Sequence, residues 1–245
     1  MLDNWMVLQE KGPDRVAPTF IANGLVDSTS GMIAIETGAI GHNMCIVTAC
    51  STGTHNIGEA AEGIRRGDYT TAICGATETP LYEVAYVGFS NMRGMGTPRE
   101  GRPLSDISRP FDRSRDGFVL GEGAGMLLLE ELEHAKQRGA TIYGEIVGYG
   151  STADAFRITD VHPEGRGAVA CIRMALKDAG LNPEDVDYIV FAPTGPVSDF
   201  GPYTKTKAVM SLWAGVETVV DNPTLTQPLC RLVDHSLTNG MIEWV

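Results

Sequence analysis

An apolar run that passes directly into a helical pattern constrains the fold of this chain more than any other feature. Residues 44–49 read MCIVTA, which predicts a buried strand, and the helical pattern that follows continues through Ile57 and Ile64 to Gly67. Cys50 stands at the junction, where the first N–H groups of a helix lack partners and the helix dipole favours negative charge. That position favours the thiolate form, so the sequence predicts a nucleophile for thioester chemistry.

Cys50 also has a simpler interpretation. An isolated cysteine is usually a small buried residue of the core and takes no part in chemistry. Its neighbours Ser51, Thr52 and Gly53 are small enough to let a substrate approach the backbone, and they favour the nucleophile. The residues alone leave the structural interpretation open.

Strand and helix patterns alternate along the rest of the chain. Apolar runs predict further strands, and a periodicity of about 3.6 residues predicts the helices between them. The predicted strands span residues 70–76, 126–129, 142–149 and 186–191, and the predicted helices span residues 32–40, 80–95, 130–138 and 168–179. Such alternation is typical of an α/β domain with a mainly parallel sheet.

Two further segments are predicted to be structural. The glycine-rich segment GEGAG at 121–125 enters a strand, whereas a phosphate-binding fingerprint must open a helix. We interpret it as a turn in which backbones approach closely, with Glu122 hydrogen-bonding to neighbouring loops. Cys74 is predicted to lie in the core. The segment RPFDRSRDGF predicts an internal network of ion pairs among Arg109, Asp112, Arg113, Arg115 and Asp116.

Composition argues against several classes of function. Lys and Arg number 19 and Asp and Glu number 31, which gives a formal net charge of −12, and an acidic protein repels nucleic-acid phosphates. No window approaches the ~18 uninterrupted apolar residues of a membrane-spanning helix. The N-terminal MLDNWMVLQEKG lacks the basic and apolar regions of a secretory signal. Five cysteines without metal-ligand spacing indicate a reducing cytoplasm and no metal site.

Two long runs carry a resemblance to a known family. The run VTACSTGTHNIGEAAEGIRRGDYTTAICGATE resembles the nucleophile segment of the β-ketoacyl-acyl-carrier-protein synthases, the condensing enzymes of fatty acid synthesis. The run SRPFDRSRDGFVLGEGAGMLLLEELEHAKQRGATIYGEIVGYG is similar to a second signature of that family. The resemblance covers roughly residues 1–189 and is closest to the type that elongates longer acyl chains, synthase II.

The resemblance implies a thiolase-like layered fold (α/β/α/β/α), built from two related halves. Residues 1–140 would form the N-terminal half that carries the nucleophile, without its first strands. Residues 141–245 would form part of the C-terminal half, with a tail that diverges after about residue 190. We therefore expect this chain to hold an incomplete set of the family's elements.

The resemblance also implies a reaction, a decarboxylative Claisen condensation in the cytoplasm. Cys50 would take the acyl chain as a thioester, and Ala49, Ser51, Gly53 and Phe89 would contact the substrate. The implied partners are acyl carrier protein, acyl and malonyl thioesters and a second copy of the chain, with no metal or cofactor. The carrier protein is itself acidic, so its docking would need a basic patch, for which the candidates are Arg15, Arg93, Arg99 and Arg102.

The sequence departs from the family at its two catalytic histidines. Ala192 stands where the histidine of an H-G-T-x-T loop is expected. Leu225 and Cys230 stand near the lysine and the histidine of a T-K-S-x-x-G-H segment. Among the other histidines, His55 is interpreted as a pocket or packing residue and His162 as a polar surface residue, and His235 matches no family motif. The tail would follow from a shifted reading frame, a decayed gene or genuine divergence.

Two other functions stay open on these residues. The chain could be an inactive or acylation-only fragment that acts as a dimerising module, through the apolar residues 43–48. It could also be a thiolase-type or hydrolytic enzyme that uses Cys50 with another base.

Overall fold

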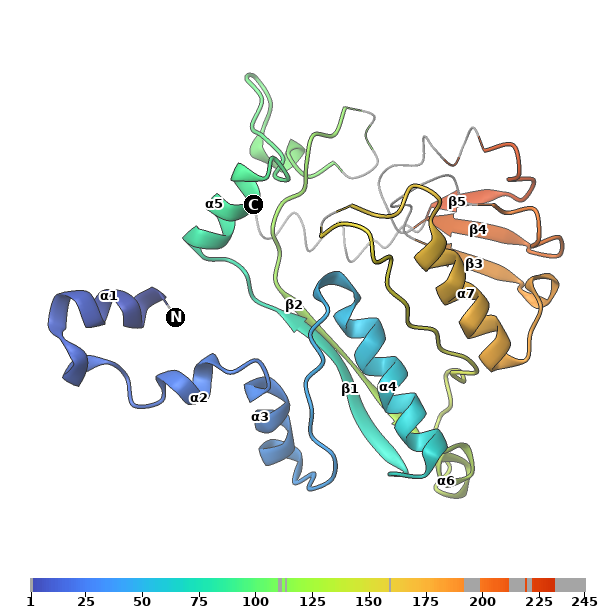
Figure 1. Ribbon diagram of the computed structural model, residues 1–245, viewed down its shortest axis with the longest axis horizontal. Coiled ribbons are helices and arrows are strands. Elements are labelled where there is room, and N and C mark those ends of the chain that lie inside the picture. The colour runs from blue at the N-terminus through green and yellow to red at the C-terminus, as the bar shows by residue number, and fades with distance from the viewer. Residues whose placement is uncertain are drawn as a thin grey trace. The chain divides into compact units, whose positions relative to one another are not determined.

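The computed structural model describes residues 2–109, 112, 114–158, 160–191, 199–211, 219 and 222–231. The chain divides into two compact units, each built from two separate stretches of sequence (Figure 1). Unit 1 combines Met1–Thr77 with Ala124–Ile142, and unit 2 combines Glu78–Gly123 with Tyr143–Val245. Both units contain helices and strands, which confirms the predicted α/β class.

Unit 1 places one long helix beside a pair of strands. Its elements are α1 (Leu2–Lys11), η1 (Pro13–Arg15), α2 (Phe20–Gly24), α3 (Ser28–Thr37), η2 (Ala49–Ser51), α4 (Thr52–Arg66), β1 (Thr71–Glu78), β2 (Gly123–Glu130) and α6 (Leu132–Gln137), where η denotes a short 3-10 helix. The helix α4 confirms the prediction for the segment after Cys50. It ends at Gly67, whose φ of 77° is left-handed and whose N–H bonds to the carbonyls of Gly63 and Ile64.

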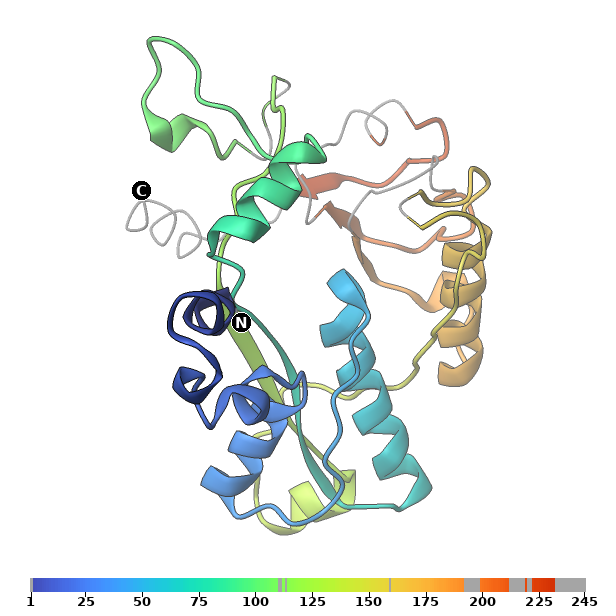
Figure 2. The same cartoon turned by 60° about the vertical axis from the view of Figure 1, so that its left-hand side comes forward.

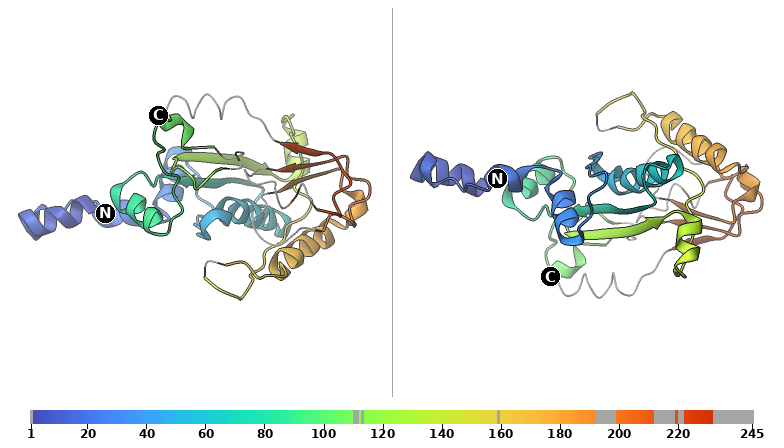
Figure 3. Two further views of the ribbon diagram at one scale, coloured as in Figure 1. Left: turned by 90° about the horizontal axis from the view of Figure 1, so that it is seen from above. Right: turned by 90° about the horizontal axis from the view of Figure 1, so that it is seen from below.

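The helix α4 lies along one face of β1 and β2 (Figures 2 and 3). The buried positions of the helix are the small residues Gly58, Ala60, Ala61 and Gly63, and a Cβ at Gly53 would lie 3.5 Å from the Ala76 side chain of β1. The side-chain amide of Asn56 adds a polar contact, with Nδ2 donating to the Gly75 carbonyl at 3.1 Å. These contacts fix the start of α4 relative to β1.

The strands β1 and β2 are hydrogen-bonded neighbours that run in opposite directions. Glu131 donates to the carbonyl of Thr70 at one end of the pair, and Gly75 lies against Gly125 toward the other. Cys74 of β1 is buried, as predicted, and its thiol faces the Leu127 carbonyl of β2 at 3.8 Å. Glu122 accepts a hydrogen bond from the N–H of Leu81 at 3.1 Å and the backbones approach closely at Gly125, as predicted. The predicted turn at 121–125 is wrong, because residues 123–125 are already part of β2.

Two predicted strands are wrong. In the described part of the chain, residues 42–48 and 140–150 belong to no strand. An apolar run shows only that a segment suits a strand, and a ladder also needs a neighbouring strand to pair with. For Ile46, the Asn56 side chain takes that place, since its Oδ1 accepts from the Ile46 N–H at 3.3 Å and its Nδ2 donates to the Ile46 carbonyl at 3.4 Å.

The second run packs against a helix instead of a strand. Tyr149 donates its N–H to the Asp178 carboxylate at 2.9 Å, and the thiol of Cys171 donates to the Gly150 carbonyl at 3.1 Å. A Cβ at Gly148 would lie 2.3 Å from the Ala175 carbonyl oxygen, so the backbone can approach the helix only because this residue is glycine.

Unit 2 contains a parallel sheet, as predicted. Its elements are α5 (Glu83–Asn91), η3 (Leu104–Asp106), α7 (Arg166–Ala179), η4 (Pro183–Asp185), β3 (Tyr188–Phe191), β4 (Ala208–Ser211) and β5 (Leu229–Arg231). The strand order is β3-β4-β5, with Tyr188 opposite Ala208 and Val209 opposite Leu229. Phe200, Val209 and Val219 form the buried core of this sheet.

The predicted helices are present with different ends. The helix α3 ends at Gly38, whose φ is 69°, three residues before the predicted end at Gly41. The helices α5 and α6 are shorter than the ranges predicted for them. Among the described residues, no helix has the length and apolar composition that crossing a bilayer requires.

Candidate active site

Cys50 lies in η2, a single 3-10 turn that leads directly into α4. Its thiol is free and exposed, so the interpretation of Cys50 as a buried core residue is wrong. The start of α4 at Thr52 places Cys50 at the positive end of a 15-residue helix. The predicted position of Cys50 at a helix start is therefore confirmed.

The residue before Cys50 has an unusual backbone conformation. Ala49 has a φ of 53°, in the left-handed region that a residue with a Cβ adopts only at a cost of roughly 1–2 kcal/mol. Conformations of this kind persist only where the surrounding structure holds them, and they cluster at functional sites. The turn that carries Cys50 is thus a constrained one.

Side-chain hydrogen bonds close this turn. The N–H of Thr48 donates to the Thr52 hydroxyl at 2.9 Å, and the Ser51 hydroxyl lies 2.8 Å from the Thr48 carbonyl and 3.0 Å from the Thr48 hydroxyl. The Thr48 hydroxyl also lies 2.6 Å from Nδ1 of His55, one turn into α4. Thr48 therefore links the segment before Cys50 to the helix that follows it. The sequence shows this only as a threonine and a histidine on either side of a helix start, which is not a distinctive signal.

The residues predicted to contact the substrate fall into two groups. Ala49, Ser51 and Gly53 flank Cys50 in the chain, and the backbone of Gly53 lies near the Ala76 side chain of β1. Phe89 belongs to α5 in unit 2, where it is half-buried and its ring meets that of Phe118 edge-on at a centroid distance of 5.3 Å.

The positions expected for the family histidines have other surroundings. Leu225 packs against the apolar core of unit 2, and Cys230 lies in β5 opposite Met210. Ala192 and His235 lie outside the described residues. His162 is half-buried in a loop, where its Nδ1 accepts from the Glu164 N–H at 3.2 Å.

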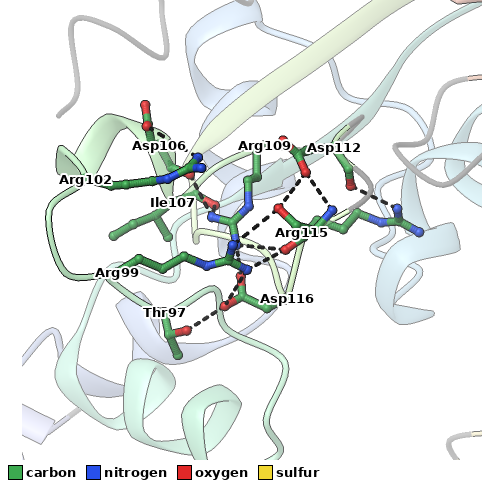
Figure 4. Close-up of polar contacts among 10 residues, drawn as sticks. Thr97, Arg99, Arg102, Asp106, Ile107, Arg109, Asp112, Arg115 and Asp116 are labelled. Carbon is green, nitrogen blue, oxygen red and sulfur yellow. Dashed lines mark hydrogen bonds and ion pairs between the residues drawn. The ribbon is translucent and has the colours of Figure 1, made fainter.

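An ion-pair network holds the loop after α5 (Figure 4). The guanidinium of Arg109, nine-tenths buried, donates to the Asp116 carboxylate at 2.7 Å and to the Asp106 carbonyl at 2.8 Å. The Thr97 hydroxyl donates to the same carboxylate at 2.6 Å, and this bond together with Arg109 lowers the pKa of Asp116. The predicted network is confirmed for the Arg109–Asp116 pair.

Other members of that charged segment bond differently. The Asp112 carboxylate accepts from the Ser114 hydroxyl and N–H, which lowers the pKa of Asp112, while Arg113 lies outside the described residues. Two of the basic candidates for a docking patch form ion pairs. The Arg99 guanidinium lies 3.9 Å from the Asp116 carboxylate, and the Arg102 guanidinium lies 4.0 Å from the Asp106 carboxylate. Within the described ranges, His, Cys, Asp and Glu side chains form no group of three or more that could hold a metal ion.

Two family models and curated relatives match most of this chain. The family described as beta-ketoacyl synthase, N-terminal domain, matches residues 3–135, and the beta-ketoacyl synthase C-terminal domain matches residues 143–199. The 3-oxoacyl-[acyl-carrier-protein] synthase 2 of Rhizobium meliloti (strain 1021) is 44% identical over 199 residues, which are 81% of this chain and 47% of that protein. The synthase of the same name from Staphylococcus aureus is 46% identical over 193 residues, 78% of this chain and 47% of that protein.

Solved structures show the same fold. A type II PKS acyl-carrier protein in complex with its ketosynthase, bound to the hexaketide, gives a TM-score of 0.72 at 33% identity and covers 82% of this chain and 52% of that one. A beta-ketoacyl synthase from Burkholderia phymatum STM815 gives a TM-score of 0.68 at 29% identity, with 86% and 53% covered. The fold is therefore thiolase-like, as predicted, and the chain spans about half the length of the curated relatives it matches.

Proposed function

The chain belongs to the beta-ketoacyl synthase family, and on that premise we propose that Cys50 is the acyl-accepting nucleophile of a 3-oxoacyl-acyl-carrier-protein synthase. One observation supports this most: a free, exposed thiol on a constrained turn at the start of a long helix. The first N–H groups of the helix lie next to this position, and exposure allows a bulky thioester to reach the sulfur.

The first step of the proposed reaction is acyl transfer. The Cys50 thiolate attacks the carbonyl carbon of an acyl thioester, and a new C–S bond forms while the bond to the donor's sulfur breaks. The donor leaves as a thiolate and takes up a proton. The small residues Ser51 and Gly53 leave room for the acyl carbonyl beside the backbone.

The second step is condensation with a malonyl thioester. Loss of CO₂ leaves an enolate, whose carbon forms a bond to the acyl carbonyl as the Cys50 C–S bond breaks and the thiolate returns. Donors aimed at the developing oxyanions are worth roughly 3–4 kcal/mol each in enzymes of acyl transfer. Residues 192, 225 and 230 do not supply the family's histidine motifs, so we expect condensation to be slow compared with acylation.

The proposal includes the partners and the location of the reaction. We propose acyl carrier protein as the acyl and malonyl donor, a homodimer as the assembled form and the cytoplasm as the compartment. The solved complex of a ketosynthase with an acyl-carrier protein supports the first, and the free thiols of Cys45, Cys50, Cys74 and Cys171 support a reducing compartment. We also propose residues 1–140 and 141–245 as the two halves, supported by family matches that end at residue 135 and resume at residue 143.

Intact mass measurement tests the acylation step. After incubation with an acyl-carrier-protein thioester, we expect the wild-type protein to gain one acyl group and Cys50→Ala to gain none. Cys171→Ala is the matched control, because that half-buried thiol bonds to the Gly150 carbonyl, and it should be acylated like the wild type. An absent adduct, or one that Cys50→Ala leaves unchanged, would contradict the proposal.

A second incubation separates condensation from hydrolysis. Adding malonyl-acyl-carrier protein to the acylated chain should release a β-ketoacyl product together with CO₂. Loss of the acyl group without the malonyl donor would instead indicate a thioester hydrolase.

A further inference from the structure

The turn around Cys50 has Thr48 at its centre. The backbone N–H, the carbonyl and the hydroxyl of Thr48 each take part in a side-chain hydrogen bond, with Thr52, Ser51 and His55 as partners. These three partners all lie on the helical side of Cys50, in η2 or the first turns of α4. The bonds therefore span the nucleophile and bind the segment before it to the helix after it.

We call the hydrogen bonds among Thr48, Ser51, Thr52 and His55 the clasp. They are contacts that hold Ala49 in its left-handed conformation. A left-handed alanine relaxes toward an ordinary φ unless other contacts hold it. Thr48, its neighbour, has φ −137° and ψ 39°, outside the regular helix and strand regions. Two successive residues with irregular backbones are thus followed directly by Cys50. The clasp crosses them, together with the backbone hydrogen bond from the Ser51 N–H to the Thr48 carbonyl at 3.3 Å.

We infer that Thr48 and His55 are positioning residues for Cys50, which hold the thiol at the start of α4 through the hydrogen bond between the Thr48 hydroxyl and the His55 imidazole. The inference rests on the proposed function, because it assigns the pair a role in presenting the proposed nucleophile. Neither residue is assigned a contact with substrate. Their effect is on the geometry of the turn and, through it, on the reactivity of Cys50.

Loosening the turn has a chemical consequence. When Ala49 relaxes, Cys50 moves relative to the first N–H groups of α4, and the helix dipole acts strongly only within its first turn. Alkylation of Cys50 then slows, because the sulfur no longer lies where the N–H donors at the helix start can act on it.

Iodoacetamide labelling followed by peptide mass analysis tests the inference without any acyl donor. Thr48→Val keeps the shape of the side chain and removes the hydroxyl, and we expect Cys50 labelling to slow roughly fivefold, the change that one hydrogen bond typically makes. Thr48→Ser retains the hydroxyl and should restore labelling to within about twofold of the wild type. His55→Asn, whose amide can take the place of Nδ1, should be closer to the wild type than His55→Ala.

Two controls separate positioning from loss of structure. Thr54→Val makes the same chemical change in the first turn of α4, outside the clasp, and should leave Cys50 labelling unchanged. Labelling of Cys74 reports on folding, since this buried thiol of β1 faces the Leu127 carbonyl and would react faster in a loosened unit.

The inference is overturned if Thr48→Val labels Cys50 at the wild-type rate, or if Cys50 and Cys74 change together, or if Thr48→Ser fails to restore the rate. Acyl transfer is measured separately on the same variants. A wild-type protein that is not acylated but whose Cys50 labelling depends on the Thr48 hydroxyl would contradict the proposed function and leave the positioning role standing.

Discussion

At the scale of single residues, Gly75 is a position in unit 1 that has no room for a side chain. Its φ is 156°, and a Cβ built on it would lie 2.0 Å from the Gly125 carbonyl oxygen and 2.9 Å from Cα of Met126. Both are backbone atoms of β2, which cannot move aside without disturbing the strand pair. The sequence predicted a close approach of backbones at the glycine-rich segment, and the structure identifies Gly75 as the partner in it.

Gly75→Ala should therefore destabilise the protein by roughly 2–4 kcal/mol, the sum of backbone strain and a steric clash. Gly125→Ala is the matched control, because a Cβ there meets no atom within 4 Å, and it should change stability by less than about 1 kcal/mol. Urea unfolding followed by circular dichroism measures both variants. Equal midpoints for the two would show that the close approach is not maintained in solution.

The residues around Cys50 show what sequence can and cannot predict at this scale. A cysteine at the start of a helix follows from the apolar run and the helical period, so that position was predictable. The role of Thr48 was not, because its hydrogen bonds exist only once Ala49 adopts a left-handed φ. Alanine at position 49 does not signal that conformation, whereas glycine, asparagine or aspartate would have.

At the scale of elements, the helix α6 is attached to β2 by a charged cluster. The Glu130 carboxylate, at the end of β2, bonds to Nδ1 of His134 at 2.9 Å and to the Arg138 guanidinium, whose Nε lies at 2.8 Å. The hydrogen bond from Arg138, with that from His134, lowers the pKa of Glu130 from its ordinary 4.5 to about 2. A carboxylate with a lowered pKa stabilises the folded state above its ordinary pKa, and that contribution is lost as the pH falls toward the lower value.

Glu130→Gln should therefore lower the unfolding midpoint near neutral pH, and the difference from the wild type should shrink as the pH falls from about 4.5 toward about 2. Glu133→Gln is the matched control on the same helix, because its 2.8 Å pair with Lys136 is exposed and contributes little. Urea unfolding over this pH range measures both. A difference for Glu130→Gln that stays constant with pH would show that the carboxylate is not what stabilises α6.

Elements were predicted well where a local signal exists. The helix α4 follows from its apolar period and its terminal glycine, and β3 from a short apolar run after a capped turn. The runs at 44–49 and 142–149 have the same apolar character as β1, yet only β1 has a neighbouring strand to pair with. Strand pairing is a property of the assembled sheet, so periodicity alone could not separate these cases.

At the scale of the whole molecule, the described residues bury few large apolar side chains. In unit 1 the buried apolar residues are small, namely Ala60, Ala61, Cys74 and Ala135. Large apolar side chains on the surface include Ile40 and Tyr143, which are 99% and 98% exposed. Exposed apolar surface of this kind marks interaction sites, so the proposed homodimer would cover surface that the chain alone leaves in water.

Residues 43–48 are the segment through which we expect two copies to associate. They form no strand, and Met44 and Val47 are 56% and 60% exposed, so a second copy could pair with this segment and bury both side chains. Covering a side chain of this size is worth roughly 1.5–3 kcal/mol, so Val47→Lys should weaken dimerisation at least about tenfold.

Ile158→Lys is the control variant. It changes an equally apolar and fully exposed residue of unit 2 and should leave dimerisation unchanged. Light scattering coupled to size-exclusion chromatography over a range of concentrations measures the association. A wild-type protein that stays monomeric throughout, or an Ile158→Lys variant that dissociates as readily as Val47→Lys, would place the dimer contact elsewhere or remove it.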